Sequence, residues 1–136
     1  MTSVVVHGAD ETAAAFRRFE DDLDREIERA NTKVADLVAD EARATARGLG
    51  STAARVSGSI VVVDQGESAA VELGGGYPEA AGAEFGANQY PQFQPWRGAG
   101  EDGGYFLYPA IRANEDQIDH EYTEALDSAM TRNGLT

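Results

Sequence analysis

A long stretch without glycine or proline, from Asp10 to Arg47, constrains the fold more than any other feature of the sequence. Apolar residues recur in it every three or four positions, the spacing that places side chains along one side of an α-helix. These residues are Phe16, Phe19, Leu23, Ile27, Ala30, Val34, Leu37 and Val38. The sequence therefore predicts a single helix over 10–47. With a rise of about 1.5 Å per residue it would be roughly 55 Å long, more than a compact domain of this size needs, so we expect it to pack beyond its own subunit.

Shorter elements are predicted at both ends of this helix. The β-branched run Ser3–His7 predicts a strand that ends at Gly8, and Asp10 is a favourable residue to cap the start of the helix. Gly48 and Gly50 predict the end of the helix and a loop, because glycine favours the backbone conformation that terminates helices.

A hairpin is predicted in the middle of the chain. Residues Ser59–Asp64 and Ala69–Leu73 have the composition of two strands, and a turn at residues 65–67 joins them. After the hairpin, residues 78–84 predict a short helical turn.

A second helix is predicted from Pro109 to Met130, because proline suits the first turn of a helix and apolar residues again keep a helical spacing. That spacing is kept by Ile111, Ile118, Tyr122, Ala125 and Ala129. The expected fold class is α+β in a single domain over 1–136. In it, the long N-terminal amphipathic helix and the C-terminal helix pack on a small, mainly antiparallel sheet.

Residues 86–104 form a long loop rich in glycine and proline, in which no periodicity indicates a helix or strand. Unstructured connections of this length are uncommon in compact domains, which favours a functional role or ordering by a neighbour. Aromatic residues are concentrated in and around the loop, and rigid rings supply much of the apolar contact area of protein interfaces. The candidate interface residues are Phe85, Tyr90, Phe93, Trp96, Arg97 and Tyr105. The alternative is that the loop folds back and buries its rings in the chain's own core.

The net charge of -13 restricts the classes of partner. Binding to phosphates needs clustered cations, so this charge argues against a nucleic-acid grip and against adhesion to an anionic membrane. No apolar run approaches the roughly 18 residues of a membrane span, and the N-terminus has no pattern of an export signal. We expect a soluble protein without a membrane partner.

Acidic residues are concentrated on the side of the long helix opposite its apolar stripe. They are Glu20, Asp21, Asp22, Asp24, Glu26 and Glu28. Some of them are like-charged pairs four residues apart, which destabilise a helix by a few tenths of a kcal/mol each. One interpretation is a solvated helix face. The other is a surface that repels an anionic neighbour, for which Glu20, Asp21, Asp22, Asp24 and Glu28 are the leading candidates.

The sequence offers no catalytic, cofactor-binding or metal-binding motif. It has no cysteine, which excludes disulfides and thiolate chemistry. Asp119, His120 and Glu121 are consecutive, and consecutive helical residues point about 100° apart, so the three cannot share a metal ion. Gly74–Gly76 lacks the lysine and hydroxyl residue of a phosphate-binding loop. We therefore expect a protein that is not an enzyme and uses no cofactor.

Local signatures follow one another in a specific order. Gly8-Ala9-Asp10 closes the predicted first strand, Ser59-Ile60 opens the hairpin, Glu84-Phe85-Gly86 follows it, and residues 105–110 (Tyr-Phe-Leu-Tyr-Pro-Ala) lead into the final helix. Over nearly the whole chain this order resembles the small head–tail joining proteins of long-tailed bacteriophages, also called tail-completion or neck proteins.

The resemblance implies a structural protein of the virion, assembled in the host cytoplasm. It would form a homo-oligomeric ring, expected to be hexameric, at the junction between the head connector and the tail proteins. The acidic surface would then face the passing genomic DNA and repel it. Alternatives within this class are a tail terminator and a head-side adaptor or stopper. The alternative from another class is an acidic protein that mimics DNA and binds a basic cleft.

Overall fold

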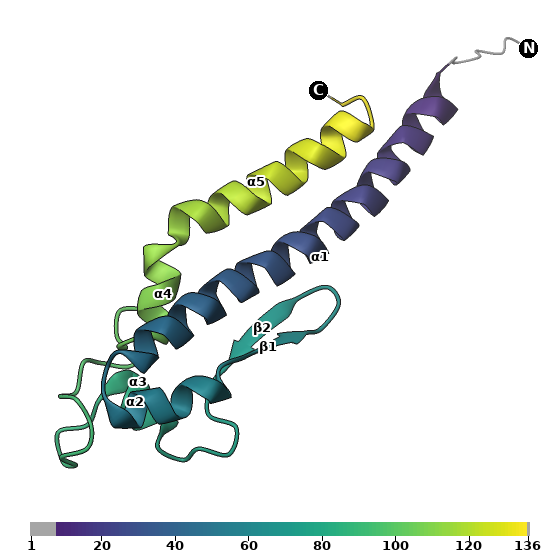
Figure 1. Ribbon diagram of the computed structural model, residues 1–136. Helices are drawn as coiled ribbons and strands as arrows, with labels where there is room; N and C mark the ends of the chain where they lie inside the picture. The colour runs from purple at the N-terminus through teal and green to yellow at the C-terminus, as the bar shows by residue number, and fades with distance from the viewer. Residues whose placement is uncertain (1–7, 136) are drawn as a thin grey trace, which may run out of the picture.

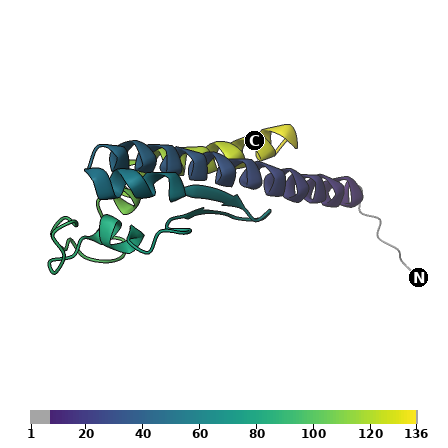
Figure 2. The ribbon, with the colours of Figure 1, turned by 60° about the horizontal axis from the view of Figure 1, so that its bottom comes forward.

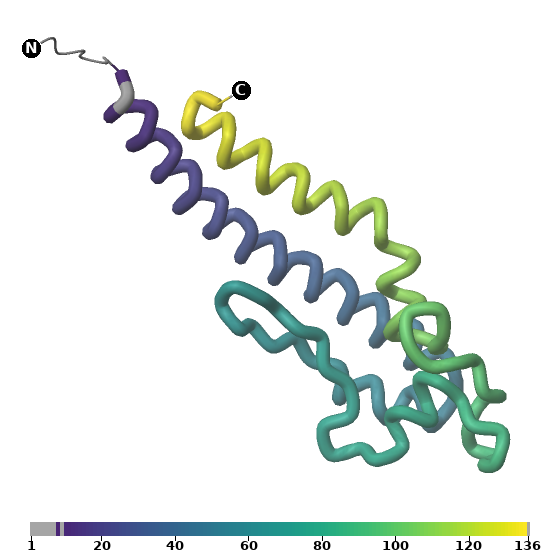
Figure 3. Tube along the Cα trace, turned by 180° about the vertical axis from the view of Figure 1, so that it is seen from behind, coloured from purple at the N-terminus to yellow at the C-terminus, as the bar shows by residue number. Residues whose placement is uncertain are grey.

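Helix α1 (Ala9–Arg47) extends along the whole of the structure, and the other elements pack against its sides (Figure 1). The computed structural model describes residues 8–135, so the strand predicted at Ser3–His7 lies outside the described residues. Helix α5 (Glu115–Arg132) runs antiparallel along one side of α1, and the hairpin of β1 (Val61–Asp64) and β2 (Ala69–Glu72) lies along another (Figures 1 and 3). The predicted α+β fold class is confirmed, including the long N-terminal helix.

The side of α1 that is buried changes along its length. Near its C-terminal end the buried residues are alanines and one valine, and their small side chains let the hairpin and the following helices approach the α1 backbone closely. These residues are Ala35, Val38, Ala39, Ala42 and Ala46. Near its N-terminal end, by contrast, the predicted core residue Phe16 is 52% exposed. No helix of the described residues, α1 included, combines the length and apolarity needed to cross a bilayer.

Helix α2 (Ser51–Val56) replaces the loop that the sequence predicts after α1. The long helix does end at Arg47, but Gly50 turns the chain sharply with a φ of 115°, and its carbonyl accepts a hydrogen bond from the Ala54 N–H. A 3₁₀ turn at Ser57–Ser59 then leads into the hairpin. The glycines correctly predict a break, but the alanines after them form a new helix instead of a linker.

The predicted hairpin forms, with Val62 opposite Val71 and Asp64 opposite Ala69 in antiparallel register, but its first strand begins at Val61 instead of Ser59 because the 3₁₀ turn takes in Ser59. It makes a two-stranded sheet within the described residues. The Arg43 side chain of α1 donates a hydrogen bond of 2.9 Å to the Ile60 carbonyl and so ties the start of the hairpin to the helix.

The predicted helix over 109–130 is wrong as a single element. The chain forms α4 (Leu107–Ala113) and then α5, with a break at Asn114 (Figure 1). The Asn114 side chain donates hydrogen bonds to the Ala110 carbonyl and to the Glu41 carboxylate of α1. The break depends on this tertiary contact with α1. No glycine or proline at this position predicts it from the sequence.

The core lies where α1, α2, the hairpin and α4 meet. Phe106, Ile60 and Val56 are its largest fully buried apolar side chains. Short helix α3 (Ala80–Phe85) packs beside α2 and closes this end of the molecule (Figures 1 and 2).

Candidate assembly interface

The aromatic loop, residues 86–104, joins α3 to α4 at the end of the molecule where α1 terminates (Figures 1 and 2). As predicted, no helix or strand lies in it. Its backbone is nevertheless ordered by hydrogen bonds: the Arg97 N–H donates to the Phe85 carbonyl over 2.8 Å, and the Ala87 N–H donates to the Gln94 carbonyl over 2.9 Å. The loop is a fixed structure without regular elements.

The buried carboxylate of Glu84, in the last turn of α3, fixes the far end of the loop. Its Oε1 accepts the backbone N–H groups of Tyr105 (2.6 Å) and Phe106 (3.1 Å), and its Oε2 accepts that of Leu107 (2.6 Å). The first N–H groups of a helix have no partner within the helix, and a carboxylate there also interacts favourably with the helix dipole. Glu84 therefore caps α4 from outside the helix and joins both ends of the loop.

The protonation of Glu84 reflects two opposing effects. The side chain has no exposed surface, and burial disfavours its charged form. The three N–H donors favour the charged form. Burial is the larger effect, and it raises the pKa of Glu84 above the ordinary glutamate value.

Two arginines hold the second half of the loop. The Arg97 guanidinium lies 4.2 Å from the centre of the Tyr105 ring, a distance typical of cation–π contacts. Arg112 of α4 donates hydrogen bonds to the carbonyls of Glu101 (2.5 Å) and Gly103 (2.7 Å). Arg97 and Tyr105 are therefore used within the chain, although both were expected at an interface.

The other predicted interface residues divide into two groups. Tyr90 and Trp96 are each 54% exposed. Phe85 and Phe93 are half-buried: the Phe85 ring packs 5.9 Å from that of Tyr108, and the Phe93 ring meets Tyr90 edge-on at 6.2 Å. The rings of Phe85 and Phe93 are thus partly covered by the chain, and those of Tyr90 and Trp96 face outward. A role in an interface stays a prediction.

The predicted acidic face is wrong for Asp22 and Glu26. Asp22 is 9% exposed, receives a 2.8 Å hydrogen bond from Asn133, and is paired with Arg25. Arg132 of α5 lies 3.1 Å from Glu26 and 3.9 Å from Asp22. The Asn133 amide and the Arg25 guanidinium lower the pKa of Asp22. The antiparallel path of α5 brings Arg132 and Asn133 to these carboxylates, which sequence spacing on α1 cannot reveal.

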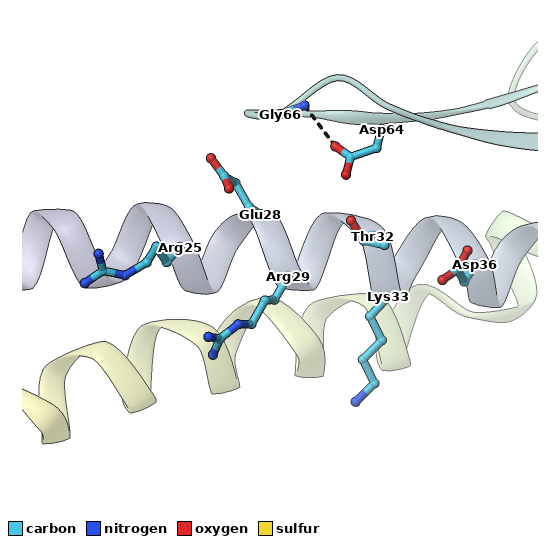
Figure 4. A pocket seen from close by; sticks show the side chains of 8 residues that line it. All are labelled: Arg25, Glu28, Arg29, Thr32, Lys33, Asp36, Asp64 and Gly66. Carbon is cyan, nitrogen blue, oxygen red and sulfur yellow. Dashed lines mark hydrogen bonds between the residues drawn. The ribbon is translucent and has the colours of Figure 1, made fainter.

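The remaining acidic residues of the cluster are exposed. They are Glu20, Asp21, Asp24 and Glu28. Figure 4 shows Glu28 pointing to the side of α1 where the hairpin and Asp64 lie, whereas Arg29 and Lys33 extend toward α5. Glu28, Arg29, Lys33 and Asp64 border an open depression of about 540 Å³, in which carboxylates and cations are mixed. Because both signs of charge line the depression, it favours neither an anionic nor a cationic ligand.

The side chains of His120 and Glu121 do not converge on a common point either. His120 Nε2 lies 3.1 Å from Glu124, while Glu121 turns the other way to Lys33 at 3.0 Å. Among residues 8–135, no group of three or more potential ligands is placed to hold a metal ion.

An apolar groove is the surface that the sequence does not predict. It has a volume of about 310 Å³, and α1, β2, α4 and α5 all contribute to it. Its floor includes Val34 and Val38 of α1, and Ala69 and Val71 of β2 form one wall. The opposite wall includes Ile111, which is 37% exposed. The sequence contains part of the signal for this groove, since Val34 and Ile111 belong to the apolar stripes of the two predicted helices.

Substitution of Gly86 tests whether the loop is held rigidly. Gly86 has a φ of 83°, and a Cβ there would lie 2.1 Å from the Pro95 carbonyl oxygen. Gly86→Ala should therefore destabilise the protein by more than the roughly 1–3 kcal/mol of backbone strain alone, measured by urea unfolding. Gly100→Ala is the matched control, because Gly100 has a φ of 81° and open space around it. Equal losses in the two variants would contradict the packed loop.

Glu84 should make stability depend on pH in a defined direction. With its pKa raised, the folded protein binds a proton more tightly than the unfolded chain, so this contribution to stability falls as pH rises from the ordinary glutamate pKa through the raised one. The substitution Glu84→Gln removes this pH-dependent contribution to stability. The difference in free energy of unfolding, wild type minus variant, should decrease over that pH range, with Glu101→Gln as the control. An increase with pH would mean that the N–H donors outweigh burial.

No protein-family model, curated protein or solved structure compared with the chain matches it.

Proposed function

We propose that the protein is a structural subunit of a ring at the head–tail junction of a long-tailed bacteriophage, where it completes the tail and lines the DNA passage. The observation that carries the proposal is the aromatic loop, which presents Trp96 and Tyr90 to the outside although backbone hydrogen bonds hold both of its halves. Large exposed rings on a preformed surface are typical of interface anchors. The order of sequence signatures supplies the location in the virion.

The distribution of surfaces supports a ring over a two-fold dimer. The aromatic loop lies at one end of the molecule (Figure 1), while residues of α1, β2, α4 and α5 line the groove. A contact between two different surfaces of identical subunits is head-to-tail, and such contacts close into rings when the rotation permits. Six subunits would match the tail's symmetry.

The exposed acids supply the second part of the proposed function. With Asp22 and Glu26 paired to α5, the residues that can act on a neighbour by repulsion are Glu20, Asp21, Asp24 and Glu28. A like-charged wall would let DNA pass without adhering to it.

Trp96→Ala tests the ring and its anchor together. At high protein and salt concentrations, light scattering should give the mass of about six subunits for the wild type. Trp96→Ala should keep the circular dichroism spectrum and lose about 2 kcal/mol or more of association, roughly 30-fold in affinity. Leu126→Ala, which truncates a side chain 41% exposed on α5, is the control.

Each contrary result has a separate meaning. If Trp96→Ala unfolds, Trp96 belongs to the chain's own core. If the wild type stays monomeric and is missing from purified virions, the assignment to the neck is wrong. Electron microscopy of the particle would distinguish a tail-completion ring from a terminator or a head-side stopper.

Neutralisation of the exposed acids tests the repulsive wall. A variant with Asp21→Asn, Asp24→Asn and Glu28→Gln should assemble normally but retain DNA or eject it more slowly. The defect should be largest at low salt, because exposed charges are screened within roughly 8 Å at physiological ionic strength. The matched control changes Asp116, Asp119 and Asp127 of α5 to Asn, with the same change in net charge. Equal effects of the two variants would contradict a specific acidic wall.

A further inference from the structure

The apolar groove lies beside an unpaired strand edge. Within residues 8–135 the sheet has only β1 and β2, so each strand has one edge without a partner. Of the two strands only β2 lines the groove, through Ala69 and Val71, so the groove borders β2 and not β1. Backbone groups along such an edge are a template for another strand, and apolar walls beside it give pockets for alternate side chains.

A polar bridge defines one boundary of the groove. Tyr122 of α5 donates a hydrogen bond to the Asn31 side-chain oxygen, and Asn31 donates one of 2.9 Å to the Glu67 carbonyl in the hairpin turn. This bridge ties α5, α1 and the hairpin together across the groove. The walls are therefore held apart at a fixed spacing, and the groove is preformed.

One segment of the chain has the composition to fill it. In Ser3–His7 three consecutive valines are flanked by serine and histidine. In an extended strand Val4 and Val6 point to one side, and Ser3, Val5 and His7 point to the other. The segment could therefore place two valines against the groove and direct its polar residues to solvent.

Chain geometry prevents this segment from reaching its own groove. Val34 lies about 38 Å from Ala9 along the axis of α1, at about 1.5 Å per residue. Val4 is four residues before Gly8, and an extended chain spans at most about 3.6 Å per residue, or roughly 14 Å. The groove of a second copy has no such restriction.

We propose that residues Ser3–His7 of one copy bind the groove of a neighbouring copy, as a strand added to the free edge of β2 with Val4 and Val6 against the groove. The inference rests on the proposed self-assembly. The segment and the groove are different surfaces, so the contact can be repeated head-to-tail from copy to copy, and it closes into a ring when the rotation permits.

Engineered cysteines test the contact directly, because the chain has none of its own. A Val4→Cys protein carrying a size tag is mixed at high concentration with an untagged Ile111→Cys protein and oxidised. A disulfide-linked heterodimer is expected on a non-reducing gel. The control replaces Ile111→Cys with Asp127→Cys, an exposed position on α5 that does not line the groove.

Three cross-linking results would overturn the proposal: no heterodimer, equal yields with Ile111→Cys and Asp127→Cys, or a cross-link that forms only within one chain carrying both Val4→Cys and Ile111→Cys. Circular dichroism of each variant establishes that it is folded.

A second measurement does not depend on ring closure. A fluorescent peptide Ser-Val-Val-Val-His-Gly should bind the full-length Val4→Ser, Val6→Ser variant by anisotropy, and adding Ile111→Glu should weaken binding at least tenfold. A peptide with the first and third valines replaced by serine is the control. Failure of the peptide to bind would overturn the segment's role.

The two proposals can fail separately. If light scattering shows no ring but the peptide binds, the ring is wrong and the groove remains a site for this segment. If the ring forms with undiminished affinity in the Val4→Ser, Val6→Ser variant and no cross-link appears, the segment's role is wrong and the ring stands.

Discussion

The capping of α4 by the buried Glu84 carboxylate is the interaction on which this end of the molecule depends. The backbone N–H groups of Tyr105, Phe106 and Leu107, where the chain enters α4, need acceptors, and the Glu84 side chain of α3 accepts all three. The same side chain brings the two ends of an otherwise irregular loop together. Its burial is costly for a carboxylate, and the N–H donors offset part of that cost only while α3 and the start of α4 stay in contact. The aromatic surface is therefore positioned by a polar interaction underneath it.

Helix α1 serves two packing partners with two different chemistries. Its C-terminal half offers alanines to the hairpin and α2, where close approach of backbones provides the contact. Its N-terminal half meets α5 partly through ion pairs, in which Asp22 and Glu26 share Arg132. Two adjacent carboxylates that would repel on an isolated helix are thereby placed around one guanidinium, which removes the penalty expected from the spacing alone.

Local sequence signals predict the elements that local physics determines, and fail where a tertiary contact decides. Periodicity predicts α1, and the valine run at 61–63 with the turn at Gly66 predicts the hairpin, because each depends on neighbours in sequence. The break at Asn114 depends on Glu41, and the burial of Asp22 depends on Asn133, both far away in the chain. For the candidate site, the loop and its exposed Trp96 are predictable from composition. The role of Glu84 is not, since its residue type marks it as a surface acid, although the Glu-Phe-Gly signature contains it.

The overhang of α1 beyond its partners gives the helix a gradient of local stability. Asp22 is tied to Asn133, just past the last turn of α5, and in the turns before Asp22 both Phe16 and Arg18 are exposed. A helical segment without packing is marginally stable in water, so these turns open with a smaller free energy than the alanine-lined end. Their amide hydrogens should therefore exchange faster than those of the alanine-lined end. A neighbour that covered these turns would supply the missing free energy and so would order the N-terminal turns of α1.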